Sequence, residues 1–109
     1  MANAYKILGQ IADASANDVA LYLVPSSTEA IVSTIVVANR EAATNTFRIA
    51  VRPGGATLAN EHYLAYDASI SANDTITLTL GITLADNDIV TVGASDANVS
   101  FSAFGTVIT

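Results

Sequence analysis

The stretch Thr75-Ile76-Thr77-Leu78-Thr79-Leu80-Gly81-Ile82-Thr83-Leu84 decides the fold class of this chain. Its even positions are all aliphatic, whereas its odd positions are threonine or glycine. This two-residue period is typical of a β-strand with one buried face, because a helix would scatter the five aliphatic side chains around its circumference. Gly81 interrupts the β-branched threonines, so a bulge or bend is expected there. The stretch predicts a central strand, or two strands that meet at Gly81.

Shorter runs of the same kind lie on both sides of this stretch. Residues 30–38 are apolar on both faces, which predicts a strand buried on both sides or packed against another subunit. Residues 46–52 alternate cleanly, and the polar connection of residues 39–45 is short enough to pair these two runs as antiparallel neighbours. Further strands are expected over residues 5–8, 19–24, 61–65, 89–93 and 98–108.

The last of these runs loses its alternation near its end. Val99, Phe101 and Ala103 share one parity, but Phe104, Val107 and Ile108 do not hold it. A bulge near Gly105 would explain the slip.

Turn signals divide the chain at regular intervals. Asn-Asp pairs precede apolar runs at positions 17–18, 73–74 and 87–88, and Pro53-Gly54-Gly55 is a strong turn sequence. This spacing predicts an all-β single domain, residues 1–109, that forms an antiparallel β-sandwich of about seven to eight strands, immunoglobulin-like or jelly-roll-like. Two sets of residues are expected to form its core: Ile76, Leu78, Leu80, Ile82 and Leu84, with Phe47, Ile49 and Val51.

Composition excludes several classes of function. The 109 residues contain no cysteine, so disulfides, thiolate chemistry and cysteine-bound zinc are ruled out. The net charge is −6 with only Lys6 and three arginines, which argues against nucleic acid or an anionic membrane as a partner. The first residues lack a basic segment followed by an apolar one, so no secretory signal is predicted and synthesis in a cytoplasm is expected.

The low charge also bears on self-association. Charged residues make up 13% of the chain, against about 25% in typical soluble proteins. Because residues 31–37 are apolar on both faces, one face can fill the sandwich and the other needs a second cover. A homo-oligomer is therefore expected, with Ile31 among the interface residues.

No catalytic or cofactor-binding arrangement is evident. His62 is the only histidine, and its neighbours Glu61 and Tyr63 would point to the opposite face of a strand, so packing is expected there. Asp86-Asn87-Asp88 offers oxygen ligands but lacks the glycine and glutamate of an EF-hand, so it predicts a turn. The glycines after Pro53 lack the lysine of a phosphate loop. The chain is accordingly expected to be non-enzymatic, with no catalytic residue, metal or cofactor.

The remaining candidates are residues that would contact a partner. Arg48 and Arg52 flank Ala50 on one strand face, where each either pairs across the sheet with an acidic residue or anchors an interface. Tyr63 and Tyr66 form either half-buried packing or a small carbohydrate platform.

Several sequence segments together resemble a known group of proteins. They are Leu21-Tyr22-Leu23-Val24-Pro25, the run from Ile31 to Arg40, Phe47-Arg48-Ile49-Ala50-Val51-Arg52-Pro53, Asn60-Glu61-His62-Tyr63, and the run from Asp74 to Leu84. Their pattern, which covers most of the chain, is similar to that of small all-β virion proteins of tailed bacteriophages.

The resemblance implies a structural protein of the virion, synthesised in the host cytoplasm. It favours a capsid decoration, or cement, protein that binds the major capsid protein or other virion proteins and stabilises the assembled head. It also favours a trimer over a dimer. The alternative is a neck, tail or tail-fibre component, including a receptor- or glycan-binding module.

Overall fold

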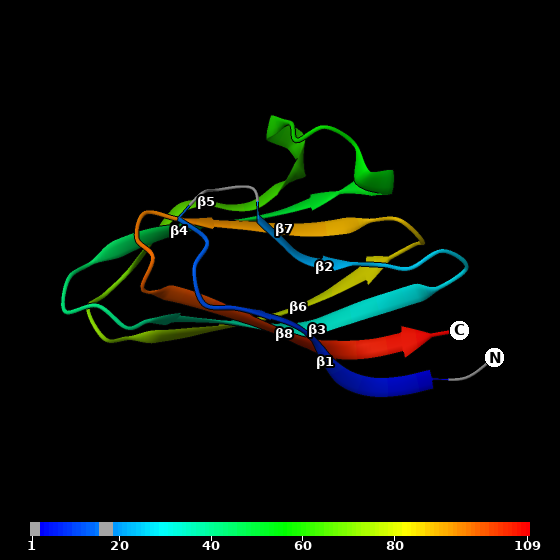
Figure 1. Ribbon diagram of the computed structural model, residues 1–109, viewed down its shortest axis with the longest axis horizontal. Helices are drawn as coiled ribbons and strands as arrows, with labels where there is room; N and C mark the ends of the chain where they lie inside the picture. The colour runs from blue at the N-terminus through cyan, green and yellow to red at the C-terminus, as the bar shows by residue number, and fades with distance from the viewer. Residues whose placement is uncertain (1–2, 16–18) are drawn as a thin grey trace.

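Eight strands and two short 3-10 turns make up the described chain, residues 3–15 and 19–109, in the computed structural model (Figure 1). The strands are β1 (Asn3–Ile11), β2 (Val19–Leu23), β3 (Glu29–Asn39), β4 (Asn45–Arg52), β5 (Tyr63–Ile70), β6 (Thr75–Leu84), β7 (Ile89–Ala94) and β8 (Val99–Ile108), and the turns are η1 (Pro53–Gly55) and η2 (Asn60–His62). The predicted all-β class and the number of strands are confirmed. The expected turn at Asn17-Asp18 lies outside the described residues.

The chain folds back on itself around its middle. Strands at equal distances from the η1–η2 segment pair as antiparallel neighbours: β4 with β5, β3 with β6, β2 with β7 and β1 with β8. The resulting ribbon rolls up when β3 also pairs with β8 and β4 with β7. Two four-stranded sheets result, in the orders β1-β8-β3-β6 and β2-β7-β4-β5, and Figure 1 shows them as two layers. Of the two predicted architectures, this is the jelly roll.

The expected pairing of residues 30–38 with residues 46–52 is wrong. These runs became β3 and β4, which lie in different sheets. The connection between them crosses from one layer to the other, and its length alone does not distinguish such a crossing from a hairpin. In this rolled ribbon, consecutive strands lie in opposite sheets everywhere except at the β4–β5 fold-back, so local spacing predicts the wrong partner for β3.

The core lies between the two sheets. Phe47 and Ile49 of β4 meet Phe101 of β8 across the layers, and the two phenyl rings pack edge to face with centroids 6.4 Å apart. Val32, Ile35 and Val37 supply the third strand of this core and are fully buried. The cross-layer contact of aromatic and aliphatic side chains confirms the β-sandwich.

The strand that decides the fold class lies at an edge. β6 is a single strand that pairs only with β3, so the expectation of a central position is wrong. Alternation in the sequence indicates that one face of a strand is buried, but it does not indicate whether the strand has a pairing partner along both of its edges. Gly81 has φ +64°, and the register with β3 shifts between Val32 and Thr34, which confirms the expected bulge. The bulge turns Leu80 to solvent, so its expected place in the core is wrong.

The irregularity expected near Gly105 is caused by extra residues in the two strands that pair with β8, and not by β8 itself. Within β8, Phe101, Ala103 and Val107 all face the core, so the strand keeps one parity throughout. The extra residues are Leu8 in β1, opposite the Ala103–Phe104 step, and Ser33 in β3, opposite the Phe104–Gly105 step. Phe104 therefore faces outward, where the sequence suggested a bulge of β8 itself.

A buried amide ties two loops together at one end of the sandwich. Asn39 is buried, and its Nδ2 lies within hydrogen-bonding distance of the carbonyl oxygens of Ala43, Ile70 and Ser71 at 2.8, 3.3 and 3.0 Å. Its Oδ1 accepts hydrogen bonds from the Glu41 amide and from Asn45 Nδ2. Since buried polar groups need partners, this network specifies how the loops at this end meet.

A close approach of two strands joins the layers at one edge of the sandwich. β1 passes over β2 at Gly9, where a Cβ would overlap the carbonyl oxygen of Leu21. Only glycine therefore permits this spacing between the two sheets.

Candidate functional site

The outer face of the sheet β1-β8-β3-β6 carries the largest group of exposed apolar side chains. Tyr5 pairs with Thr106, which pairs with Ile31, and Ile7 pairs with Phe104 in the next outward-facing row. Tyr5 is 84% exposed and Ile7 55% exposed, and Leu80 at the β6 bulge is also exposed. We call this surface the bare face; it is defined by Tyr5, Ile7, Ile31 and Phe104.

The bare face is almost free of charge. Lys6 and Glu29 are the only charged residues in its four strands, and Glu29 stands in the end row. Lys6 pairs with Gly105, is exposed, and is among the residues that line a hollow on this face. The rest of the face is built from threonine, serine, asparagine, glutamine, glycine and apolar residues. Apart from Lys6 and the end row, no charge has to be desolvated when a partner covers this surface, so the cost of removing its water is low.

A hollow of about 520 Å³ opens on the bare face. Tyr5, Ile7, Ser33 and Phe104 are among the residues that line it. It lies where the extra residues Leu8 and Ser33 bend the sheet. The face therefore offers an exposed aromatic side chain beside a shallow apolar depression.

The opposite sheet differs because part of its outer side is covered. The segment 53–62, with η1 and η2, lies over this side of the upper layer (Figure 1). Ala50 and Thr91 pair with each other between inward-facing neighbours, so both point outward, yet both are buried. We call the uncovered part of this side the arginine face; it is defined by Arg48, Tyr63, Tyr66 and Asp67.

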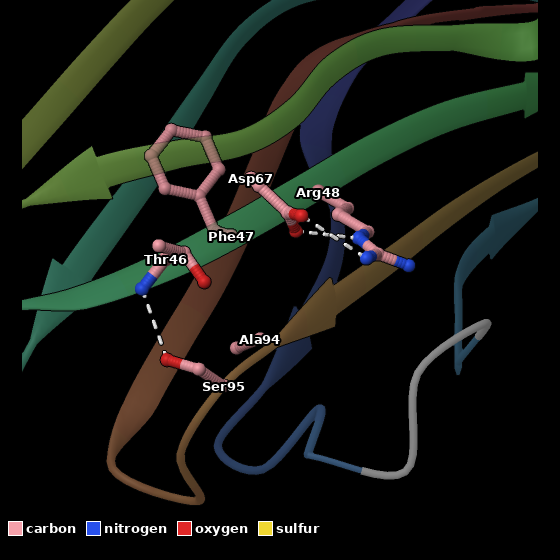
Figure 2. Close-up of a pocket in the computed structure, with 6 residues that line it drawn as sticks. All are labelled: Thr46, Phe47, Arg48, Asp67, Ala94 and Ser95. Carbon is pink, nitrogen blue, oxygen red and sulfur yellow. Dashed lines mark hydrogen bonds and ion pairs between the residues drawn. The ribbon is translucent and has the colours of Figure 1, made fainter.

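The arginine face is organised by an ion pair across β4 and β5. Arg48 Nε donates to Asp67 Oδ1 at 2.7 Å, and Nη2 donates to Oδ2 at 3.2 Å. Figure 2 shows the two side chains reaching toward each other beside a hollow of about 160 Å³, which is also lined by Thr46, Phe47, Ala94 and Ser95. The hydrogen bonds from Arg48 lower the pKa of Asp67, and the carboxylate raises the pKa of Arg48. Of the two readings of Arg48, the cross-strand pair is confirmed.

Two tyrosines complete this face. The Arg48 guanidinium carbon lies 4.2 Å from the centre of the Tyr66 ring, which is cation–π geometry. The rings of Tyr63 and Tyr66 pack edge to face with centroids 4.9 Å apart. Arg48, Tyr63 and Tyr66 thus form one cluster that no single stretch of sequence contains.

The other two predicted interface residues lie elsewhere. Arg52 donates from Nε to the Ala56 carbonyl at 2.7 Å and from Nη2 to the Gly55 carbonyl at 3.2 Å, so it holds the turn after β4. Ile31 belongs to the bare face on the opposite sheet. The five predicted residues therefore divide among two outer faces and a turn.

His62 has a local role that the sequence did not reveal. The expected strand over residues 61–65 begins only at Tyr63, because residues 60–62 form η2. His62 Nδ1 accepts a hydrogen bond from the Ala59 amide at 3.0 Å and so caps this turn. The strand geometry assumed for Glu61 and His62 is wrong, since a proline-glycine turn sequence does not indicate where the following strand starts.

The described residues contain neither a clustered set of metal ligands nor a membrane-spanning helix. Within residues 3–15 and 19–109, no group of three or more histidine, cysteine or acidic side chains is placed to hold a metal ion. No helix in this part of the chain is long and apolar enough to span a bilayer. Asp88 instead accepts hydrogen bonds from the amides of Gly54 and Ala85, so it serves the turn predicted for this loop.

Three residues of the bare face were missed in the sequence. Tyr5 and Ile7 lie in a run expected only to be a strand, and Phe104 was assigned to a parity slip. The signal that could have found them is the absence of charge over residues 99–109 and 75–84, two runs that pair with β3 from either side.

The sequence matches no protein-family model and no curated protein. Among solved structures, the chain is similar to one from infectious bursal disease virus, Gx strain, at 12% identity and a TM-score of 0.36. The match covers 98% of this chain and 26% of the viral chain, so the protein spans about a quarter of that length. Similarity at this level transfers neither residues nor a role.

Proposed function

We propose that this protein is a non-enzymatic structural component of a bacteriophage virion, and specifically a capsid decoration protein that binds the assembled head and stabilises it. The bare face is the observation that carries this proposal. An exposed apolar surface without charges is characteristic of a face that another protein covers. The jelly roll supports the proposal by analogy, since viral capsid domains use it, although lectins and cupins use it too.

The dimensions of the bare face fit such a contact. Four strands about 4.8 Å apart and about ten residues long give a projected area of roughly 600 Å², near the ~800 Å² that each partner contributes to a standard interface. Tyr5 supplies an aromatic anchor, and aromatic residues carry much of the binding energy at interfaces. Arg48 and Arg52 already have partners within the chain, so the bare face takes the contact role that the sequence offered to them.

Binding to an assembled shell would stabilise it by mass action. A ligand that binds only the assembled state contributes about 2.7 kcal/mol per site at a hundredfold excess over its dissociation constant. Many symmetric copies multiply this effect across a head. The chain's net charge of −6 lies almost entirely outside the bare face, where it keeps free subunits soluble and can steer them toward a basic shell surface.

The proposal is tested by matched variants on the two sheets. Ile7→Glu places a charge on the bare face, and Leu64→Glu places the same charge at a similarly exposed position of the other sheet, 52% against 55% exposed. Heads stripped of the protein are incubated with each variant and heated, and DNA release is followed by fluorescence. Ile7→Glu is expected to lose binding and protection, and Leu64→Glu to keep both.

Two results would overturn the decoration role. One is release of DNA at the same temperature from complete and stripped heads. The other is a position on the tail when the protein is located in the particle by cryo-electron microscopy.

The alternative is a tail or tail-fibre component that binds a receptor or glycan. The arginine face favours it, since Tyr63, Tyr66 and Arg48 present aromatic and hydrogen-bonding groups together. Binding to immobilised host glycans that is lost in Tyr66→Ala and kept in Ile7→Glu would favour this role over decoration.

A further inference from the structure

Within residues 3–15 and 19–109, no strand lies beside the outer edge of β6, and the four edges of the sandwich are protected to different degrees. β1 carries the exposed, charged Lys6, and β2 is five residues long, shifts its register beside Leu21 and precedes Pro25. β5 shifts its register against β4 at two places, and Asp67 within it has φ +51°. Charged side chains, shortness, proline and irregularity are the usual means by which proteins block strand pairing at an edge.

β6 lacks most of these devices. It is ten residues long and contains no charged residue and no proline. Its one irregularity is the bulge at Leu80 and Gly81, which leaves residues 75–79 as a regular half. This half presents a free backbone edge of five residues.

The partial burial of two inward-pointing side chains of β6 indicates that this edge has room for one more strand. In β3, the inward-pointing Ile35 and Val37 are fully buried. Their direct partners in β6, Leu78 and Ile76, point to the same side but are only partly buried. One more strand beyond β6 would cover these two side chains and complete the core.

We propose that residues 75–79 of β6 pair in antiparallel register with the same residues of a second copy, about a two-fold axis at Thr77. In that register Thr75 lies opposite Thr79, and Ile76 lies opposite Leu78. Threonines then face threonines on the outer side, and aliphatic residues face each other on the core side. Both kinds of cross-strand pair are stabilising.

The side-chain pattern of the edge favours a second copy as the occupant, and charge does not oppose the contact there. Two chains of net charge −6 repel each other through most of their surfaces, but residues 75–84 bring no charge into the contact. The two-fold axis gives each strand a partner with the same threonine and aliphatic pattern, as isologous contacts require.

This contact adds to the proposed function. The pairing is argued from the β6 edge alone, whereas its role in a virion rests on the proposed function. Strand pairing extends the sheet sideways, so the bare faces of both copies stay open on one side, available to a shell. It produces a dimer, in place of the trimer that the phage resemblance implies. A five-residue edge is small, so we expect association in solution at about micromolar concentrations or weaker, strengthened when a shell holds neighbours together.

Sedimentation equilibrium of three proteins at concentrations up to about 500 µM, above the expected dissociation constant, tests the pairing. Thr77→Lys places two lysines opposite each other at the axis, while Thr83→Lys makes the same change beyond the bulge on the same strand. Both threonines are exposed, so neither variant disturbs the core. We expect Thr77→Lys to weaken dimerisation by about tenfold or more and Thr83→Lys to change it by less than about twofold.

A disulfide provides the second readout. The chain has no cysteine, so Thr77→Cys creates a single thiol per chain. This thiol lies within disulfide distance of the same thiol in a second copy only in the proposed register. Oxidation is expected to yield a covalent dimer from Thr77→Cys and little from Thr83→Cys. A monomeric wild type throughout this range, equal dimerisation of both lysine variants, or equal crosslinking of both cysteine variants would overturn the pairing.

The dimerisation experiment and the shell-binding experiment can fail independently of each other. If Thr77→Lys is monomeric but still binds stripped heads, the edge and the bare face act independently, as proposed. If wild type dimerises in this register and no variant binds heads, the decoration role fails and the edge contact stands.

Discussion

The two sheets of this sandwich have similar inner faces and contrasting outer faces. The outer side of β2-β7-β4-β5 is partly covered by the segment 53–62, and its open part is organised by the Arg48–Asp67 pair. The outer side of β1-β8-β3-β6 is uncovered, nearly free of charge, and exposes Tyr5 and Ile7. The chain thus supplies its own cover for part of one sheet and leaves the other sheet exposed and apolar, and the proposed binding role rests on this contrast.

The largest expected effect is on the free energy of unfolding, and it should differ between the two faces of β8. Phe101 and Phe104 are three residues apart in β8, but Phe101 is buried against Phe47 and Phe104 faces outward. Phe101→Ala should lower the free energy of unfolding by about 3–5 kcal/mol, as buried phenylalanine truncations do, and Phe104→Ala by less than about 1.5 kcal/mol. Urea unfolding of both variants measures this difference, and equal losses would show that the bare face is not an outer face.

An intermediate effect is expected where both sheets share one polar end. Asn39→Ala removes the amide that donates to the neighbouring loop carbonyls and accepts from the buried Asn45, which keeps only its bonds to Glu41 and Ser95. Since an unsatisfied buried group costs about 1–3 kcal/mol, the loss should be on the order of 2–3 kcal/mol. Thermal and urea unfolding measure it.

Asn60→Ala, at an exposed position of η2, is the matched control and should be nearly neutral. A neutral Asn39→Ala would mean that the loops at this end meet without the network.

The smallest effect concerns the arginine face. Because Arg48 lowers the pKa of Asp67, the stability contributed by their pair is fully present above the ordinary aspartate pKa of 3.8 and is lost as pH falls through the lower pKa of the folded protein. Asp67→Asn should therefore lower Tm slightly at neutral pH, and the difference from wild type should vanish in strong acid. Differential scanning calorimetry across this pH range gives the comparison.

Asp86→Asn changes the same charge in a turn. It should not reproduce the pH-dependent difference. If it did, the effect would belong to net charge and not to the pair.

The candidate surfaces show why local sequence gives only part of such a site. Arg48 and Asp67 are nineteen residues apart and meet only because β4 pairs with β5. Tyr5, Ile31 and Phe104 come from the two ends and the first third of the chain, and the strand order β1-β8-β3 brings them together. Sequence identified three of the four residues of the arginine face as candidates but only one of the four that define the bare face.

The sequence by itself determined the all-β class, the single sandwich and the bulge at Gly81. These depend on the alternation of neighbouring residues and on the freedom of glycine at positive φ, which are local properties. Tertiary structure alone decided that β3 and β4 lie in different sheets, that β6 is an edge, and that Leu80 and Phe104 face solvent. The physical reason is that alternation specifies two sides of a strand, whereas long-range pairing decides which neighbour stands beside it and what covers each side.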